Sequence, residues 1–186
     1  GALGLGEDVD SDVPAYVDLG TDRHALMSER DNDDDGIVNI LDPFPDGCPS
    51  GHYATNGTCE LVEPGHYTND LPPYERFTCQ AGTYQPSYGQ LDCIDASPGH
   101  YVTDPASASQ IPCAVGSYQP DSGELSCIQS DPGNYVSDEG SIRQNQCSLG
   151  TYQPSSGAAD CIDAGPGYYV NDFASEEQTP CAAGTY

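Results

Sequence analysis

The chain has 186 residues and a formal net charge of -26, because 30 acidic side chains face only four arginines and no lysine. Such a field repels nucleic acid and anionic membrane surfaces, which excludes both as expected partners and leaves cations as natural ones. Hydrophobic residues make up only 36% of the chain, with 3 phenylalanines and no tryptophan, so a large buried core is excluded as well.

Residues 1–46 form a first segment that is rich in aspartate and contains no cysteine. Acidity of this kind is usually typical of disorder. One stretch near its end has the regular spacing of an ion-binding loop instead. We therefore treat residues 1–46 as a domain of their own.

The stretch with this regular spacing reads Asp31-Asn32-Asp33-Asp34-Asp35-Gly36-Ile37-Val38-Asn39-Ile40-Leu41-Asp42. Oxygen donors at positions 1, 3, 5, 9 and 12, a glycine at position 6 for the sharp turn and a backbone carbonyl at position 7 form the calcium-loop pattern. A solvated acidic loop without an ion is the alternative. The sequence predicts a bound calcium ion with these ligands: Asp31, Asp33, Asp35, the carbonyl of Ile37, Asn39 and Asp42.

The loop departs from a helix–loop–helix site, because Asp42 replaces the usual glutamate and prolines follow at Pro43 and Pro45. Over residues 31–45 it resembles a thrombospondin type 3 calcium repeat, which carries Asp-x-Asp-x-Asp-Gly and a later aspartate before a proline. The resemblance implies calcium as the ion.

A second acidic triplet, Asp8, Asp10 and Asp12, looks like half of another calcium site. Val13-Pro14 stands where the turn glycine is expected, so the triplet does not form a complete loop. These carboxylates either share a site with Asp18 or Asp22 or are surface charge.

The apolar start of the chain, residues 1–6, has few apolar partners within its own segment. A short apolar strand can add to the sheet edge of a neighbouring molecule and produce head-to-tail assembly. Local packing against the calcium loop is the alternative.

Residues 47–186 form a second domain, in which the same short pattern recurs every 17 positions. Each module begins x-x-x-Gly-x-Tyr, and two kinds of module alternate to give a 34-residue double repeat. Self-similarity at a short fixed period indicates an array in which each unit contacts mainly its neighbours. The repeated tyrosines are Tyr67, Tyr84, Tyr101, Tyr118, Tyr135, Tyr152, Tyr169 and Tyr186.

Cysteines occupy positions 1 and 15 of one kind of module and are lost together from the other kind. Joint presence and absence indicates bonding within a module, although spacing alone does not exclude pairing from Cys93 to Cys113. A shortened first module pairs the same two ends. The predicted disulfides are Cys48–Cys59, Cys79–Cys93, Cys113–Cys127 and Cys147–Cys161.

The ninth cysteine, Cys181, opens a module that stops at Tyr186, before its own position 15. We expect it to be unpaired within this sequence and the native chain to continue, with the partner cysteine about nine residues further on. A bond from Cys181 to another subunit is the alternative.

At Cys-x-x-Gly-x-Tyr and its second cysteine, residues 48–186 resemble extracellular repeats of the ephrin-receptor-like and tumour-necrosis-factor-receptor-like kind. The resemblance implies a short disulfide loop at the start of each such module, in agreement with the pairing above. The sequence departs from these families because Ile94-Asp95-Ala96 and Ile162-Asp163-Ala164 stand where a further Cys-x-x-Cys is expected.

Within the modules, short β-favouring pieces such as Gly99-His100-Tyr101-Val102 lie between Gln-Pro, Ser-Gly and Pro-Gly turn signals. The predicted fold is a small all-β, irregular, disulfide-rich array: an elongated rod with little or no helix. Its tyrosines are expected to pack along the rod rather than to form a sugar-binding ladder.

Two smaller motifs remain. Asn56-Gly57-Thr58 is a glycosylation sequon inside the first disulfide loop. Four aspartates recur once in each double repeat and are read either as turn caps or as calcium ligands between modules. They are Asp70, Asp104, Asp138 and Asp172.

The sequence contains no nucleophile with a nearby base and no phosphate-binding glycine loop, so we expect no enzyme. Paired cysteines indicate an extracellular or cell-surface location, and no apolar run is long enough to insert in a membrane. We expect a structural stalk or filament subunit with an adhesive role, self-association and calcium as partner. The alternative is a receptor or adhesin ectodomain that binds a protein or a glycan.

Overall fold

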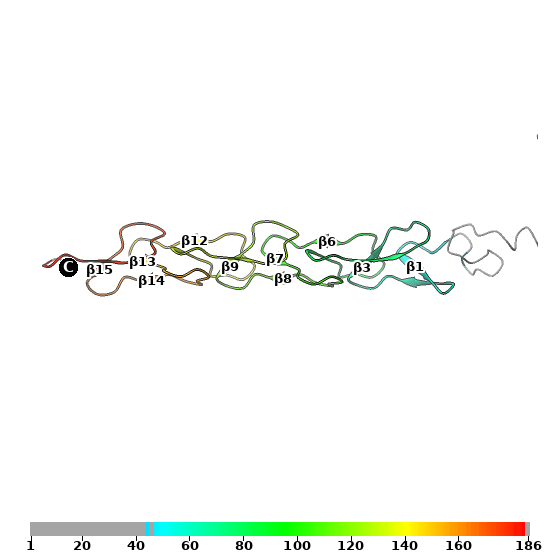
Figure 1. The fold of residues 1–186 in the computed structure, drawn as a ribbon, viewed down its shortest axis with the longest axis horizontal. Helices are drawn as coiled ribbons and strands as arrows, with labels where there is room; N and C mark the ends of the chain where they lie inside the picture. Colours follow the sequence, from blue (N-terminus) through cyan, green and yellow to red (C-terminus); the bar gives the residue numbers. More distant parts are fainter. Residues whose placement is uncertain (1–43, 45–46, 185–186) are drawn as a thin grey trace, which may run out of the picture.

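The computed structural model describes residue 44 and residues 47–184. Over this range the chain is all-β and elongated, and it contains no helix. Figure 1 shows a thin rod along which the chain advances from the β1 end to the end marked C. The expected disulfide-rich repeat array is confirmed.

Each module folds into one antiparallel two-stranded hairpin, and the eight described hairpins follow one another in chain order. The turn signals define where the strands end, and most strands contain only two residues because so short a module has little room for more. The strands are β1 (His52–Thr55), β2 (Thr58–Leu61), β3 (His66–Thr68), β4 (Arg76–Thr78), β5 (Thr83–Tyr84), β6 (Ile94–Asp95), β7 (His100–Tyr101), β8 (Ile111–Pro112), β9 (Ser117–Tyr118), β10 (Ile128–Gln129), β11 (Asn134–Tyr135), β12 (Asn145–Gln146), β13 (Thr151–Tyr152), β14 (Ile162–Asp163), β15 (Tyr168–Tyr169) and β16 (Thr179–Pro180).

The module tyrosine lies in the first strand of each hairpin and pairs with position 16 on the second strand. Tyr84 pairs with Ile94, and Tyr118 pairs with Ile128 in the same register. Aromatic and β-branched side chains paired across strands stabilise a hairpin that would be marginal alone. The tyrosines of β5 and β9 are half-buried, so they cover the rod but do not form its core.

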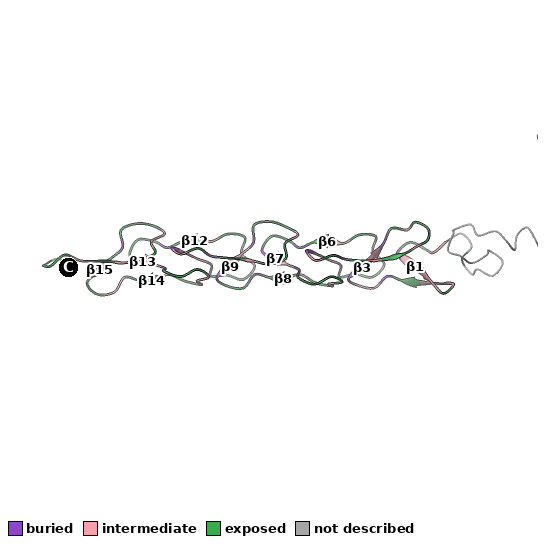
Figure 2. Ribbon diagram, viewed as in Figure 1, coloured by how far each residue is buried: buried purple, intermediate pink, exposed green. Residues whose placement is uncertain are grey.

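The core is a single narrow row of buried residues along the rod axis, shown in purple in Figure 2. Positions 1 and 7 of the modules supply it, and each of the residues named next is at most 8% exposed. Position 1 contributes Val62, Cys79, Ala96, Cys113, Ser130 and Cys147, and position 7 contributes Thr68, Gln85, Val102, Gln119, Val136, Gln153 and Val170.

The buried glutamines are satisfied locally. Gln85 donates from Nε2 to the carbonyl of Asp92 at 2.7 Å and accepts from the amide of Ser87 at 3.1 Å. Gln119 and Gln153 repeat both bonds in their own modules. Hydrogen bonds at both ends of the buried amide fix the turn and offset the cost of desolvating the amide.

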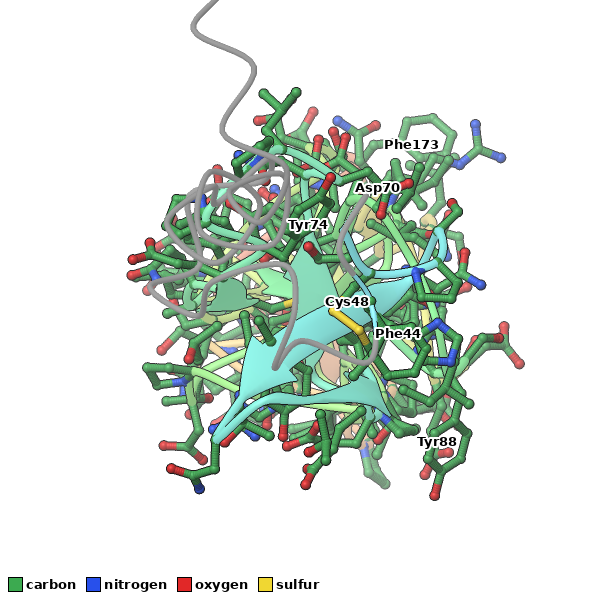
Figure 3. The ribbon with its side chains drawn as sticks, turned by 90° about the vertical axis from the view of Figure 1, so that its right-hand side faces the viewer. Phe44, Cys48, Asp70, Tyr74, Tyr88 and Phe173 are labelled. Atoms are coloured by element: carbon green, nitrogen blue, oxygen red, sulfur yellow. A yellow bond between two sulfur atoms is a disulfide. The ribbon has the colours of Figure 1, made fainter. Side chains whose placement is uncertain are left out.

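Loops of successive modules extend to alternate sides of the rod (Figure 1). Viewed along the rod, Tyr88 and Phe173, which lie on loops of the two module kinds, project from different sides of the surface (Figure 3). Their exposures are 62% and 63%. Within the described part of the chain, no helix is long and apolar enough to cross a membrane.

Candidate functional site: the contact between modules

The predicted ion sites lie outside the described residues. This holds for the calcium loop from Asp31 to Asp42, for the triplet Asp8, Asp10 and Asp12, and for the assembly strand at residues 1–6. Among residues 47–184, no cluster of three or more histidine, cysteine, aspartate or glutamate side chains could hold a metal ion.

The structure forms four disulfides, each between the two ends of one hairpin. They are Cys48–Cys59, Cys79–Cys93, Cys113–Cys127 and Cys147–Cys161. These are the pairs that joint presence and absence indicates, with Cα atoms 5.5 to 5.8 Å apart. Cys181 is free and half-buried. Multiple disulfides indicate a secreted protein in an oxidising environment.

Modules without a disulfide are closed by a different contact, which joins positions 15 and 2 at the base of the hairpin. Gln110, at position 15, accepts a hydrogen bond through Oε1 from the amide of Ser97, at position 2, with a length of 2.7 Å. Gln144 repeats the bond with Asp131 and adds a second one from Nε2 to the Asp131 carboxylate.

The remaining two modules of this kind follow the same plan. Gln178 accepts from the amide of Gly165. In the module that begins at Val62, an ion pair between Arg76 and Glu63 joins positions 15 and 2. Every described hairpin is therefore closed at its base, by a disulfide in one kind of module and by a hydrogen bond or ion pair in the other.

Three backbone hydrogen bonds join each module to the next. At the junction of the modules that begin at Cys79 and Ala96, the amide of Gly82 donates to Val102, Gln85 donates to Ser107, and Ala106 donates to Cys79. Their lengths are 2.8, 3.0 and 2.9 Å. The same three bonds recur at every junction from Val62 to Ala164.

A further contact spans two modules and depends on glycine. A Cβ atom added to Gly99 would lie 2.1 Å from the carbonyl oxygen of Gly140, a residue of the second module along. Gly65, Gly82, Gly116 and Gly133 have the equivalent contact with Ala106, Gly123, Gly157 and Ala174. Only a glycine at position 4 lets the loop of the second module along approach this closely. Each of these contacts therefore links a module to the second module along the rod.

The first junction, between the modules that begin at Cys48 and Val62, is built differently. The amide of Gly51 donates to the Asp70 carboxylate at 3.0 Å instead of to a carbonyl. Asp70 therefore accepts a hydrogen bond from a backbone amide of the preceding module. The guanidinium of Arg76 lies 5.1 Å from the centre of the Tyr53 ring, which is a cation–π contact between the two modules.

The Tyr53 hydroxyl donates to Glu60 at 2.9 Å across the first hairpin. This hydrogen bond, together with burial and the negative charge of Glu60, raises the pKa of Tyr53 above its usual value of 10.0. The phenol stays neutral at physiological pH, so it supports the hairpin as a hydrogen-bond donor.

The shortened first module gives the array a direction. In the other modules, the loop between positions 8 and 14 reaches back to the preceding one or two modules. Only Thr55 to Thr58 remain of this region in the first module, and they form a tight hairpin end. The end of the described rod near Cys48 therefore lacks the loop by which the other modules contact the module before them.

A hollow of about 260 Å³ lies between the hairpins β11–β12 and β13–β14. It is open to solvent and mostly polar, in contrast to the enclosed apolar pockets that bind small molecules. Its lining residues are Tyr135, Gln146, Ser148, Thr151, Asp160, Cys161 and Asp163.

No protein-family model and no curated protein matches this chain. The likenesses to thrombospondin type 3 and receptor-type repeats therefore rest on the quoted motifs. Repeated disulfide-bonded β-hairpin modules are the part of that description which the structure shows.

Proposed function

We propose that the protein is an extracellular structural component, a stalk or filament subunit with an adhesive role, and not an enzyme. The observation that carries the proposal is the unbroken recurrence of the same three hydrogen bonds and the same glycine contact at successive module junctions. A repeated contact of this kind transmits load along one axis and builds no concave, water-excluding site for chemistry.

Disulfides contribute to the mechanical role. Each bond with a sequence separation of 14 stabilises its module by about 3 kcal/mol in the chain-entropy description. The core is only a file of small side chains, so this contribution is large relative to hydrophobic burial. The receptor-type repeat likeness of residues 48–186 supports placing such a rod outside the cell.

Calcium is proposed to stiffen the segment before the rod. The thrombospondin type 3-like loop supplies six candidate oxygen donors within one short stretch of chain, and a hard cation would hold them around one point. The ligands in this proposal remain Asp31, Asp33, Asp35, Ile37, Asn39 and Asp42.

Self-association is proposed to use residues 1–46. The first module lacks the loop that reaches back, so stacking of modules cannot join that end of one copy to another. An apolar strand such as residues 1–6 can make such a joint by adding to a sheet edge of the neighbouring copy.

A receptor or adhesin ectodomain is the second candidate. Ile94, Ile128 and Ile162 are 45% to 46% exposed and recur in every second module. A row of apolar side chains at a fixed spacing suits the recognition of an extended protein or glycan.

Negative-stain electron microscopy of the native protein tests the first candidate against the second. Images are compared in millimolar calcium, after excess chelator, and for an Asp33→Asn/Asp35→Asn variant in calcium. Ordered fibres that loosen with chelator and fail in the variant support the filament function. Isolated rods in all three samples would overturn it and leave a monomeric stalk or receptor.

A further inference from the structure

Asn56 occupies the tip of the first hairpin. Thr55 pairs with Thr58, so Asn56 and Gly57 alone connect β1 to β2. Their φ angles are 49° and 76°. Asn-Gly is the dipeptide that two-residue hairpin turns of this geometry favour. The turn therefore explains Asn56 and Gly57, but it places no demand on residue 58 beyond strand pairing.

Thr58 completes an Asn-x-Thr sequon, and this is the single Asn-x-Ser/Thr triplet of the 186 residues. Asn56 and Thr58 are both exposed. The Asn56 side chain forms no hydrogen bond with any described residue, whereas the Thr58 hydroxyl donates to the carbonyl of Thr55 at 2.8 Å. The amide is thus presented to solvent without a structural task.

Among the described residues, the surroundings of this turn leave room for a large group. The hairpin lies at the β1 end of the described rod, and its turn is not covered by a loop from a neighbouring module (Figure 1). β2 is also one of the two longest strands, and three of its four residues are exposed. A two-stranded hairpin with an open edge invites pairing with other chains, and a bulky hydrophilic group at its tip would hinder that.

We propose that Asn56 carries an N-linked glycan in the secreted protein. The co-reactant is an oligosaccharide joined to a polyprenyl pyrophosphate. A bond forms between Asn56 Nδ2 and C1 of the first sugar while the bond from C1 to the phosphate oxygen breaks. Nδ2 loses one proton to a base of the transferase, the polyprenyl pyrophosphate leaves with the bonding electrons, and nothing is oxidised or reduced.

The glycan limits edge-to-edge pairing of the first hairpin and leaves the module junctions free. The glycan is attached at the turn. The junction with the next module is made by Gly51, which lies just before β1, and by Ala54 within β1. Residues 1–46 remain available for assembly.

Intact mass spectrometry of the 186-residue chain, made in a eukaryotic secretory host, tests the site. The sample is measured before and after peptide-N-glycosidase treatment in heavy-oxygen water, beside a mock treatment without the enzyme. Spontaneous deamidation of Asn56-Gly57 produces no sugar mass, and any heavy-oxygen label that it takes up appears equally in the mock treatment. Four disulfides in the product show that the protein has folded.

Three variants sharpen the result. Thr58→Ser keeps the sequon and is expected to keep the glycan. Thr58→Ala removes the sequon together with the bond to Thr55, and Asn56→Asp removes the acceptor but suits the same turn. Sugar mass on the wild type and Thr58→Ser but on neither other variant supports the proposal. A folded, secreted wild type with unmodified or merely deamidated Asn56 overturns it, whatever the fibres show.

Discussion

Replacing Gly99 with alanine tests the contact that spans two modules. In the 186-residue chain Gly150 provides a matched control, because its partner 41 positions further on lies outside that sequence. The two glycines have φ values of +82° and +83°, so alanine pays the same backbone penalty of about 1–2 kcal/mol at either position. A Cβ atom on Gly99 would meet the Gly140 carbonyl at 2.1 Å, whereas a Cβ atom on Gly150 meets no described atom within 4 Å.

The clash must be relieved by moving the Gly140 loop by more than an ångström. That loop is held by the hydrogen bond from the Gly140 amide to Cys113, 2.8 Å long. Overpacking costs about 1–3 kcal/mol, and loss of the hydrogen bond adds about 1 kcal/mol. Gly99→Ala is therefore expected to lower the free energy of local opening by about 2–4 kcal/mol more than Gly150→Ala.

Hydrogen exchange of individual amides is the appropriate assay, because repeat arrays do not unfold as a single two-state unit. The Gly140 amide is expected to exchange about 30-fold to 1,000-fold faster in Gly99→Ala than in Gly150→Ala. Equal exchange in the two variants would refute the idea that the loop contact holds the rod together over three modules.

Three further predictions follow from the closing contacts and the ion site. Gln144→Ala removes both bonds to Asp131 and is expected to weaken its hairpin by about 1–2 kcal/mol, seen as faster local exchange there and unchanged exchange in disulfide-closed modules. Because the pKa of Tyr53 is raised in the folded state, the contribution of the Tyr53 hydrogen bond to stability is complete below pH 10.0 and is lost as the pH rises through the raised pKa. In an ultraviolet titration, Glu60→Gln should lower the midpoint of Tyr53 ionisation towards the usual value. Asp35→Asn is expected to weaken calcium binding at least about tenfold in titration calorimetry, while an unchanged affinity would show that the loop is not the site.

The regular spacing made the fold predictable from the sequence. Tyrosines and glycines at a constant spacing defined the modules, and the joint loss of cysteines at positions 1 and 15 indicated pairs such as Cys79–Cys93. Local periodicity carries this information because each hairpin closes within one module, so no long-range topology has to be inferred.

The contacts between modules could not be read in the same way. The Gly99 contact joins residues 41 positions apart, and the sequence shows only that Gly or Ala stands at position 11 of each module from Cys79 onward. Gln110 and Gln144 carried a usable signal, because a residue able to hydrogen-bond appears wherever the cysteine at position 15 is lost. Its partner is a backbone amide, which no side-chain pattern reveals.

Single-molecule stretching of the chain between its ends measures the proposed mechanical role most directly. With disulfides intact, the rod should resist extension until modules detach in separate steps, as expected for repeated junctions. Reduction should then release about 40 Å of additional length for each of the three disulfides with separation 14. Smooth extension from the lowest forces, as for a disordered chain, or no added length on reduction would contradict the account.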